Sequence, residues 1–255
     1  MLTLAKKYQF LFEELVKRDF KQKDKRTVLG MAWSILSPLL QLLVMSVVFT
    51  QFFGRTQAHY TIYLFCGNLV FNYFKESTST GMFSLMSNSG IITKVNVPKY
   101  MFLLSKNVSS LLNFGLSLIV FLLFVLIDGL PITPLFLMLL YPIFCLIIFN
   151  VGVGLVLSAL FVFFRDINYL YDVFTLMLMY CSAIFYTIDS FTPAIQKLYL
   201  INPVYCYIKY FRVVVIDGNL PSPQYHLLCL VYAVIMLVIG GFIYKKYNHR
   251  FLYYM

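Results

Sequence analysis

The feature that most constrains this chain is a series of six long apolar runs, which a water-soluble domain could not bury together. Hydrophobic residues make up 61% of the 255 residues and charged residues 12%, about half the share found in soluble domains. At about 1.5 Å per residue, each run is long enough for a helix to cross a bilayer. The sequence therefore predicts an all-α membrane protein with six transmembrane helices, over residues 35–53, 60–86, 108–127, 135–164, 169–188 and 227–244.

The segment before the first run, residues 1–33, predicts a helix that lies in the membrane interface. Apolar residues recur there at helical spacing, and charged residues fall mostly off that stripe. A basic cluster over residues 21–26 favours contact with the headgroups of anionic membrane lipids. The alternative is a helix that packs on the rest of the protein.

Residues 189–225 do not fit a simple span, because four prolines interrupt short apolar pieces. We interpret this region as an external pair of re-entrant helices, which is allowed at membrane depth only where it is buried in protein or lines a cavity. Together with spans one to five over residues 35–188, span six over 227–244 and a basic tail over 245–255, it completes a single transmembrane domain of residues 1–255.

The distribution of basic residues sets the expected orientation. With six spans, 15 of the 20 Lys and Arg residues fall on the side of the termini and 4 on the other, while Lys75 lies within the second span. Basic residues concentrate on the cytoplasmic side of membrane proteins. The pattern predicts a multi-pass protein of the cell inner (plasma) membrane with both termini in the cytoplasm. The net charge of +10 is thereby explained without a nucleic-acid partner.

The second run carries a polar face. Asn68, Asn72, Lys75 and Ser79 fall within a narrow arc at 100° per residue, and Glu76 follows Lys75. Because a charge near the bilayer centre is costly, it usually faces a bundle interior or water. These five residues are the predicted translocation path. The alternative is a shorter helix from which Lys75 reaches the cytoplasmic interface.

The sequence contains no constellation that indicates catalysis. The three histidines lie at predicted membrane borders, the five cysteines form no metal-binding pattern, and no GxxxxGK[ST] phosphate loop occurs. We therefore expect a chain that is not an enzyme and binds no cofactor or metal. If ATP drives transport, another chain binds it.

Four ordered motifs resemble the permeases of ABC transporters that export polysaccharide. The first is a basic run followed by Thr-x-Leu-Gly-x-x-Trp-x-x-Leu-x-Pro over residues 27–38. The others are NSGIITKVNVP over residues 88–98, FFRDI over 163–167, and Asn-Pro, Arg and Gly-x-x-Pro over 202–221. The resemblance covers nearly the whole chain and extends to permeases for O-antigen, rhamnan and wall teichoic acid.

This resemblance implies a permease that moves a polyprenyl-pyrophosphate-linked polysaccharide from the cytoplasmic to the external side. It also implies a homodimer of the permease with two cytosolic ATPase chains, which would bind ATP and Mg. The alternatives are a secondary transporter, for which an internal repeat is missing, another ABC transporter for a small lipid or drug, and a membrane enzyme acting on polyprenyl lipids.

The resemblance also assigns site residues by motif. The loop at residues 90–99 can be read as positive charge that only orients the chain, or as a docking surface for a soluble partner. The family favours the second interpretation. The implied ATPase-coupling residues are Ile91, Ile92, Lys94, Val97, Pro98, Arg165 and Asp166, and the implied external-gate residues are Tyr205, Tyr207, Tyr210 and Arg212.

Overall fold

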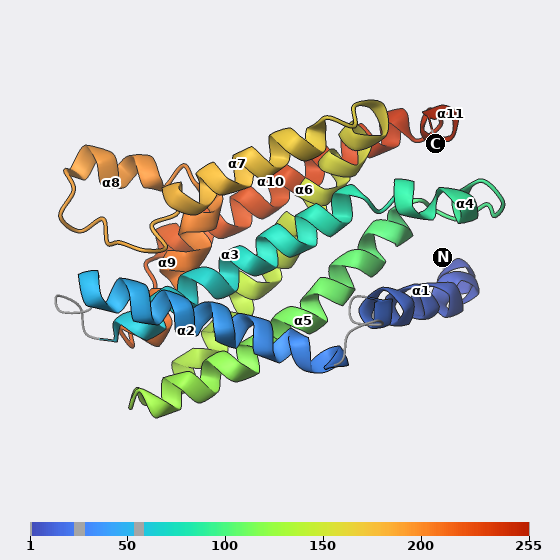
Figure 1. Cartoon of the computed structure of the whole chain (residues 1–255). Helices are drawn as coiled ribbons and strands as arrows, with labels where there is room; N and C mark the ends of the chain where they lie inside the picture. The colour runs from blue at the N-terminus through green and yellow to red at the C-terminus, as the bar shows by residue number, and fades with distance from the viewer. Residues whose placement is uncertain (1, 23–28, 54–58, 255) are drawn as a thin grey trace.

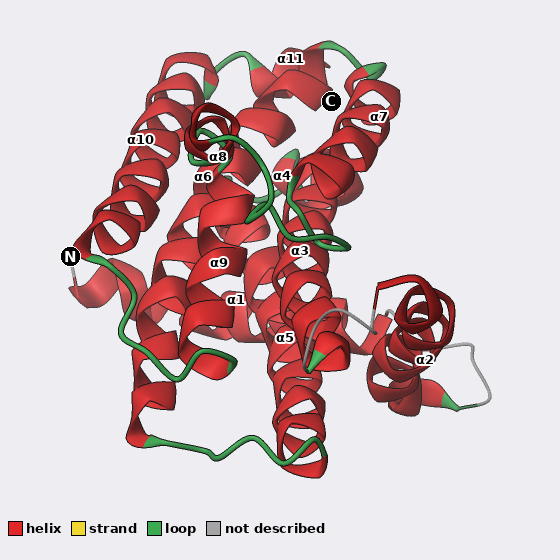
Figure 2. Cartoon of the chain, turned by 90° about the vertical axis from the view of Figure 1, so that its left-hand side faces the viewer, coloured by secondary structure: helices red, strands yellow, loops and turns green. Residues whose placement is uncertain are grey.

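The computed structural model describes residues 2–22, 29–53 and 59–254, and helices form nearly all of the ordered structure (Figure 1). No strand occurs among these described residues (Figure 2). Short 3-10 segments cover Gly30–Ala32, Met86–Asn88 and Pro134–Leu139. The α-helices are α1 (Leu2–Gln22), α2 (Trp33–Phe53), α3 (Tyr60–Met82), α4 (Ser89–Ile92), α5 (Tyr100–Ile127), α6 (Leu140–Phe163), α7 (Ile167–Cys181), α8 (Pro193–Tyr199), α9 (Pro203–Val215), α10 (Pro223–Tyr247) and α11 (Phe251–Tyr254).

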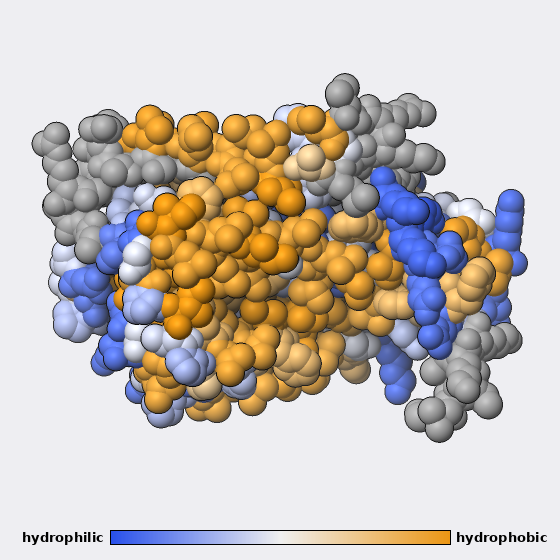
Figure 3. All heavy atoms as spheres, turned by 90° about the horizontal axis from the view of Figure 1, so that it is seen from below, coloured by the Kyte–Doolittle hydropathy of each residue, from blue (hydrophilic) through white to orange (hydrophobic). Residues whose placement is uncertain are grey.

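The long helices lie alongside one another between two ends of the molecule (Figure 1). The helices α1, α4 and α11 gather at one end together with both termini, and α8 and α9 lie at the other. Apolar side chains form a broad belt between hydrophilic ends on the face shown in Figure 3. We call the end with the termini the terminal end.

Within the described residues, three segments are long and apolar enough to cross a membrane: Tyr100–Ile127, Pro134–Phe163 and Pro223–Tyr247. The prediction of an all-helical membrane protein is confirmed to that extent. Of the other predicted spans, α2 holds a shorter apolar stretch, Trp33–Met45. The helix α7 has 15 residues, and α3 carries Lys75 and Glu76 among other polar side chains.

The close approach of α6 and α10 depends on two glycines. A Cβ atom on Gly152 would lie 2.4 Å from the backbone carbon of Met236, and one on Gly240 would lie 2.5 Å from the carbonyl oxygen of Gly152. Neither distance is compatible with a side chain. The two backbones therefore touch directly, as small residues allow in membrane helix pairs.

Several helix ends differ from the ends of the apolar runs. The helix α5 begins at Tyr100 and not at residue 108, and its first turns include the polar residues Ser105 and Lys106, which bind the Asp19 carboxylate of α1. The helix α3 ends at Met82 and not at 86, and a 3-10 turn follows. The helix α10 begins at residue 223, where Pro223 occupies the first turn and the missing N–H costs nothing.

The largest correction concerns the fifth run, which predicts a helix to residue 188. The helix α7 ends at Cys181. Ala183 adopts a left-handed φ of 51°, which a right-handed helix cannot include. The carbonyl groups of Ala183 and Ile184 instead accept hydrogen bonds from Arg212 of α9. A tertiary contact, and not a change in hydropathy, ends this helix.

Candidate functional site

A polar cleft of about 840 Å³ opens between α2, α3 and α5. The structure places all five residues of the predicted polar face, Asn68, Asn72, Lys75, Glu76 and Ser79, in its lining. The sequence predicted their grouping because they share one face of α3. Further polar lining comes from α1, α2 and α5, with Asp19, Ser34, Ser37, Gln41, Lys106, Ser109, Ser110, Asn113 and Ser117.

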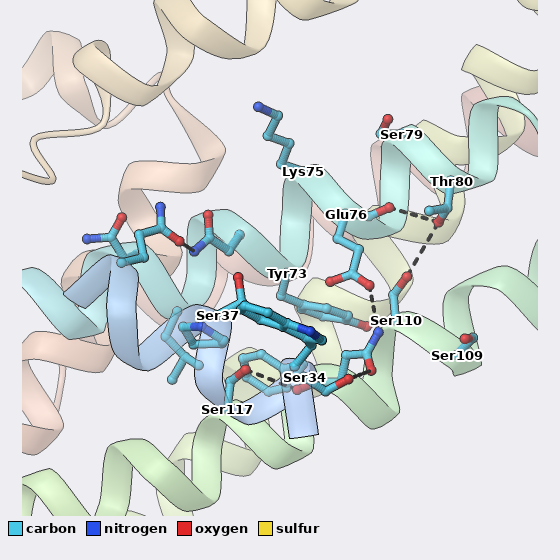
Figure 4. Close-up of a pocket in the computed structure, with 18 of the residues that line it drawn as sticks. Ser34, Ser37, Tyr73, Lys75, Glu76, Ser79, Thr80, Ser109, Ser110 and Ser117 are labelled. Atoms are coloured by element: carbon cyan, nitrogen blue, oxygen red, sulfur yellow. Dashed lines mark hydrogen bonds between the residues drawn. The ribbon is translucent and has the colours of Figure 1, made fainter. Parts of the chain in front are cut away.

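Hydrogen bonds across the cleft join its three walls. The side-chain amide of Asn113 on α5 donates to the Glu76 carboxylate on α3 over 2.7 Å (Figure 4). The Asn72 amide donates to the side-chain oxygen of Gln41 on α2 over 3.2 Å. The first bond is partly buried, where an unpaired carboxylate would be costly, whereas the second is exposed.

Lys75 differs from the other residues of this face. Its side chain is exposed and points away from Glu76, on the side of α3 that also carries Ser79 (Figure 4). The helix α3 does not end near Lys75 but continues to Met82. This does not support the alternative of a shorter helix, while the role of the Lys75 ammonium in transport stays a prediction.

The polar wall of α5 was not predicted from the sequence. Lys106, Ser109, Ser110, Asn113 and Ser117 recur every three or four residues, so they lie on one side of the helix. This periodicity was available in the sequence. The strong apolar character of residues 108–127 concealed it.

At the terminal end of the cleft, Asp19 of α1 is a buried ionic centre. Its carboxylate accepts hydrogen bonds from Lys106 over 2.9 Å, from Ser105 over 3.1 Å and from Arg18 over 2.8 Å. Arg18 also donates to the side-chain oxygen of Asn88 over 2.8 Å, just before α4. This network joins α1 both to the cleft wall and to the loop that follows α3.

The loop at residues 89–99 is anchored on both sides of an exposed tip. Ile92 and Val97 are buried in the apolar cluster of the terminal end, and the residues between them are exposed. Among the predicted coupling residues, Lys94 therefore lies on the surface, while Ile91 and Pro98 are half-buried. Burial lowers the pKa of the Lys99 ammonium, which donates to the carbonyl oxygen of Asn248.

Arg165 and Asp166 form an exposed turn between α6 and α7. This turn lies at the terminal end, as α4 does (Figure 1). The structure therefore brings the two predicted coupling segments to the same end of the molecule. Contact of either segment with an ATPase stays a prediction.

The predicted external-gate residues lie in the core and not in the cleft. Arg212 is 4% exposed and donates to the carbonyl oxygens of Ala183 over 2.8 Å and Ile184 over 3.0 Å. Its guanidinium carbon lies 3.4 Å from the centre of the Tyr63 ring. Tyr205, Tyr207 and Tyr210 are also buried, with exposed fractions of 2% or less. In this conformation Arg212 fixes the segment after α7, and substrate contact by these four residues stays a prediction.

Within the residues that the structure describes, no group of three or more His, Cys, Asp or Glu side chains is placed to hold a metal ion. The cleft instead offers hydroxyl, amide, ammonium and carboxylate groups. Such a surface can bind a polar solute through hydrogen bonds.

The family model for ABC-2 type transporters matches residues 11–216, which include the whole polar cleft. The chain belongs to the ABC-2 type transporter family. This ABC-2 permease is thus a membrane-embedded transport subunit with several apolar helices, and the membership does not support the secondary-transporter alternative.

Proteins similar to this ABC-2 permease carry a more specific name. Two proteins of Klebsiella pneumoniae, each called "O-antigen export system permease protein RfbA", are 27% identical to it, with 98% of both chains covered. A protein of the same name from Myxococcus xanthus is 23% identical over 96% of this chain and 95% of its own length. The similarity therefore extends over nearly complete chains.

Proposed function

We propose that this chain is the membrane subunit of an ATP-driven exporter for a polyprenyl-pyrophosphate-linked polysaccharide of the O-antigen, rhamnan or teichoic-acid type. The observation that carries the proposal is the polar cleft between α2, α3 and α5 in a chain of the ABC-2 family. Its hydroxyl and amide groups suit the hydroxyl groups of sugars. The near full-length similarity to proteins named O-antigen export permeases supports the choice of substrate.

In this proposal the chain crosses the inner membrane six times, with α2, α3, α5, α6, α7 and α10 as the spans. The arrangement of these helices between two ends, with both termini at one end, supports it (Figure 1). The excess of Lys and Arg on that side supports a cytoplasmic location for both termini. The helices α8 and α9 then form the external re-entrant pair.

The substrate path follows the cleft face of α3. Asn68, Asn72, Glu76 and Ser79 meet the glycan, and the exposed ammonium of Lys75 meets the pyrophosphate of the lipid carrier. The geometry that supports this division is that Lys75 points away from Glu76 and from the serines of α2 and α5 (Figure 4). A pair of permease chains would place two such faces opposite each other.

A separate ATPase chain supplies the energy, and two copies of it act on the permease pair. Its ATP and Mg do not bind to this permease. The exposed loop tip at Lys94 and the turn at Arg165 and Asp166 form the docking surface. Their exposure at one end of the molecule supports this role.

The test is to purify the tagged chain from its own host in mild detergent and to identify the proteins that come with it. A P-loop ATPase in a one-to-one ratio is the expected result, together with loss of surface polysaccharide when the gene is deleted. Lys94→Ala should weaken ATPase retention, whereas Lys197→Ala, an exposed lysine at the opposite end, should not. If no ATPase comes with the permease even after cross-linking, the proposal is contradicted. If deletion of the gene leaves the surface polysaccharide unchanged, the substrate is a small lipid or drug instead.

A further inference from the structure

A second cavity, separate from the polar cleft, lies at the terminal end of the molecule. It has a volume of about 780 Å³ and lies between the loop after α4 and the last turns of α10. This volume falls within the roughly 300–1,000 Å³ typical of small-molecule sites. Neither the export path nor the polar cleft includes its residues.

The cavity is positively charged. Lys99, Lys245 and His249 line it, and none of the described residues in its lining is acidic. Lys99 is held in place, because it donates to the Asn248 carbonyl and lies 5.6 Å from the centre of the Phe251 ring. The lining therefore attracts an anion and contains no carboxylate that would neutralise it.

Its walls are also partly apolar, and one buried polar group in them lacks a partner. Ile92, Val97 and Leu155 contribute aliphatic surface. The Tyr244 hydroxyl is buried and has no hydrogen-bond partner among the described residues, while Tyr244 itself is 6% exposed. That oxygen has almost no accessible surface, so a ligand in the cavity would meet the other atoms of Tyr244 and not its hydroxyl.

We propose that this cavity binds an anionic membrane phospholipid, with its phosphodiester headgroup on Lys245 and His249 and an acyl chain on the aliphatic wall. Basic pockets beside the cytoplasmic ends of membrane helices recognise such headgroups. A soluble protein partner fits less well, because the cavity combines apolar wall and cationic rim at the end of a membrane-spanning helix.

A bound lipid would also affect the loop that we propose as the docking surface. Asn96, Val97 and Pro98 form part of the cavity wall, so a headgroup in the cavity would hold that loop against α10. This regulatory consequence rests on the proposed function. Lipid binding itself does not depend on it.

The test uses the full-length chain, purified in detergent and stripped of lipid, with native mass spectrometry to count bound lipids. The stripped chain should bind phosphatidylglycerol and should not bind the zwitterionic phosphatidylethanolamine. Lys245→Gln should weaken phosphatidylglycerol binding about fivefold, the effect of one basic group near an anionic surface. Lys246→Gln is the matched control, because Lys246 is exposed and lies outside the cavity lining.

Tyr244→Phe keeps the ring and removes the hydroxyl. Because the hydroxyl is enclosed and unpaired, this change should leave phosphatidylglycerol binding unchanged and the stripped protein as stable as before or more stable. Tyr244→Phe is therefore a second control, which alters a lining residue without removing a cation.

Three results would overturn the proposal. Equal loss of lipid in Lys245→Gln and Lys246→Gln would show general surface attraction. Equal binding of both phospholipids would exclude headgroup recognition. Displacement of bound phosphatidylglycerol by inorganic pyrophosphate or by polyprenyl pyrophosphate would assign the site to the transport substrate. Because no ATPase or glycan enters the assay, failure here is distinct from failure of the proposed export function.

Discussion

The side-chain amide of Asn113 on α5 donates a 2.7 Å hydrogen bond to the carboxylate of Glu76 on α3. Asn113→Leu should therefore leave a partly buried carboxylate short of one donor and lower the free energy of unfolding by about 1–3 kcal/mol. Glu76→Gln keeps a hydrogen-bonding partner and should cost less. Thermal unfolding of both variants in detergent measures the difference. A loss in Asn113→Leu no larger than that in Glu76→Gln would mean that this hydrogen bond is not what stabilises the Glu76 charge.

Gly240 and Gly241 offer a matched pair for the packing of α6 on α10. Gly240→Ala should be strongly destabilising, because its new methyl group would lie 2.5 Å from the carbonyl oxygen of Gly152. Gly241→Ala meets nothing within 4 Å and should be neutral or slightly stabilising. Thermal unfolding and folded yield test this. If both variants behave alike, the close approach of the two helices is wrong.

Substitution of Arg212 should lower the stability of the protein, because its side chain binds backbone carbonyls in the core. Arg212→Lys retains a charge but loses the planar fork that binds the carbonyls of Ala183 and Ile184. We expect a loss of about 1–3 kcal/mol in stability and increased proteolysis of the segment after α7. Lys209→Gln, a neighbouring cation on α9, is the control. Normal stability with lost export would instead support the predicted ligand role.

Asp19 should hold α1 against the helix bundle. Asp19→Asn removes the charge that binds Arg18 and Lys106, so amide hydrogen exchange in α1 should become faster. Glu14→Gln, on an exposed position of the same helix, should leave the exchange rate unchanged. Unchanged protection in Asp19→Asn would show that apolar packing alone holds α1.

How far the sequence predicts this structure depends on the range of the interactions involved. The grouping of Asn68, Asn72, Lys75, Glu76 and Ser79 follows from the period of one helix, and the structure places all five in one cleft. The end of α7 could not be predicted, because it depends on a guanidinium group that lies about thirty residues further along the chain. Apolar runs locate helices well, whereas tertiary hydrogen bonds set where some of them end.

The burial of Tyr205, Tyr207 and Tyr210 illustrates the same limit. The family resemblance implies that these three tyrosines belong to an external gate. In the structure the Tyr207 hydroxyl donates to the carbonyl of Cys229, and the Tyr210 hydroxyl lies 2.9 Å from the His226 side chain. These partners are on α10, and no local pattern in the sequence identifies them.

The loop tip between Ile92 and Val97 has a mechanical consequence. Only the four residues 93–96 separate two buried anchors, so the tip has little slack. A force applied at Lys94 is not absorbed by the loop and must displace the packed side chains at the start of α5. The tip therefore transmits displacement to the helix bundle. A longer or more flexible loop would transmit less of the movement of any partner that binds it.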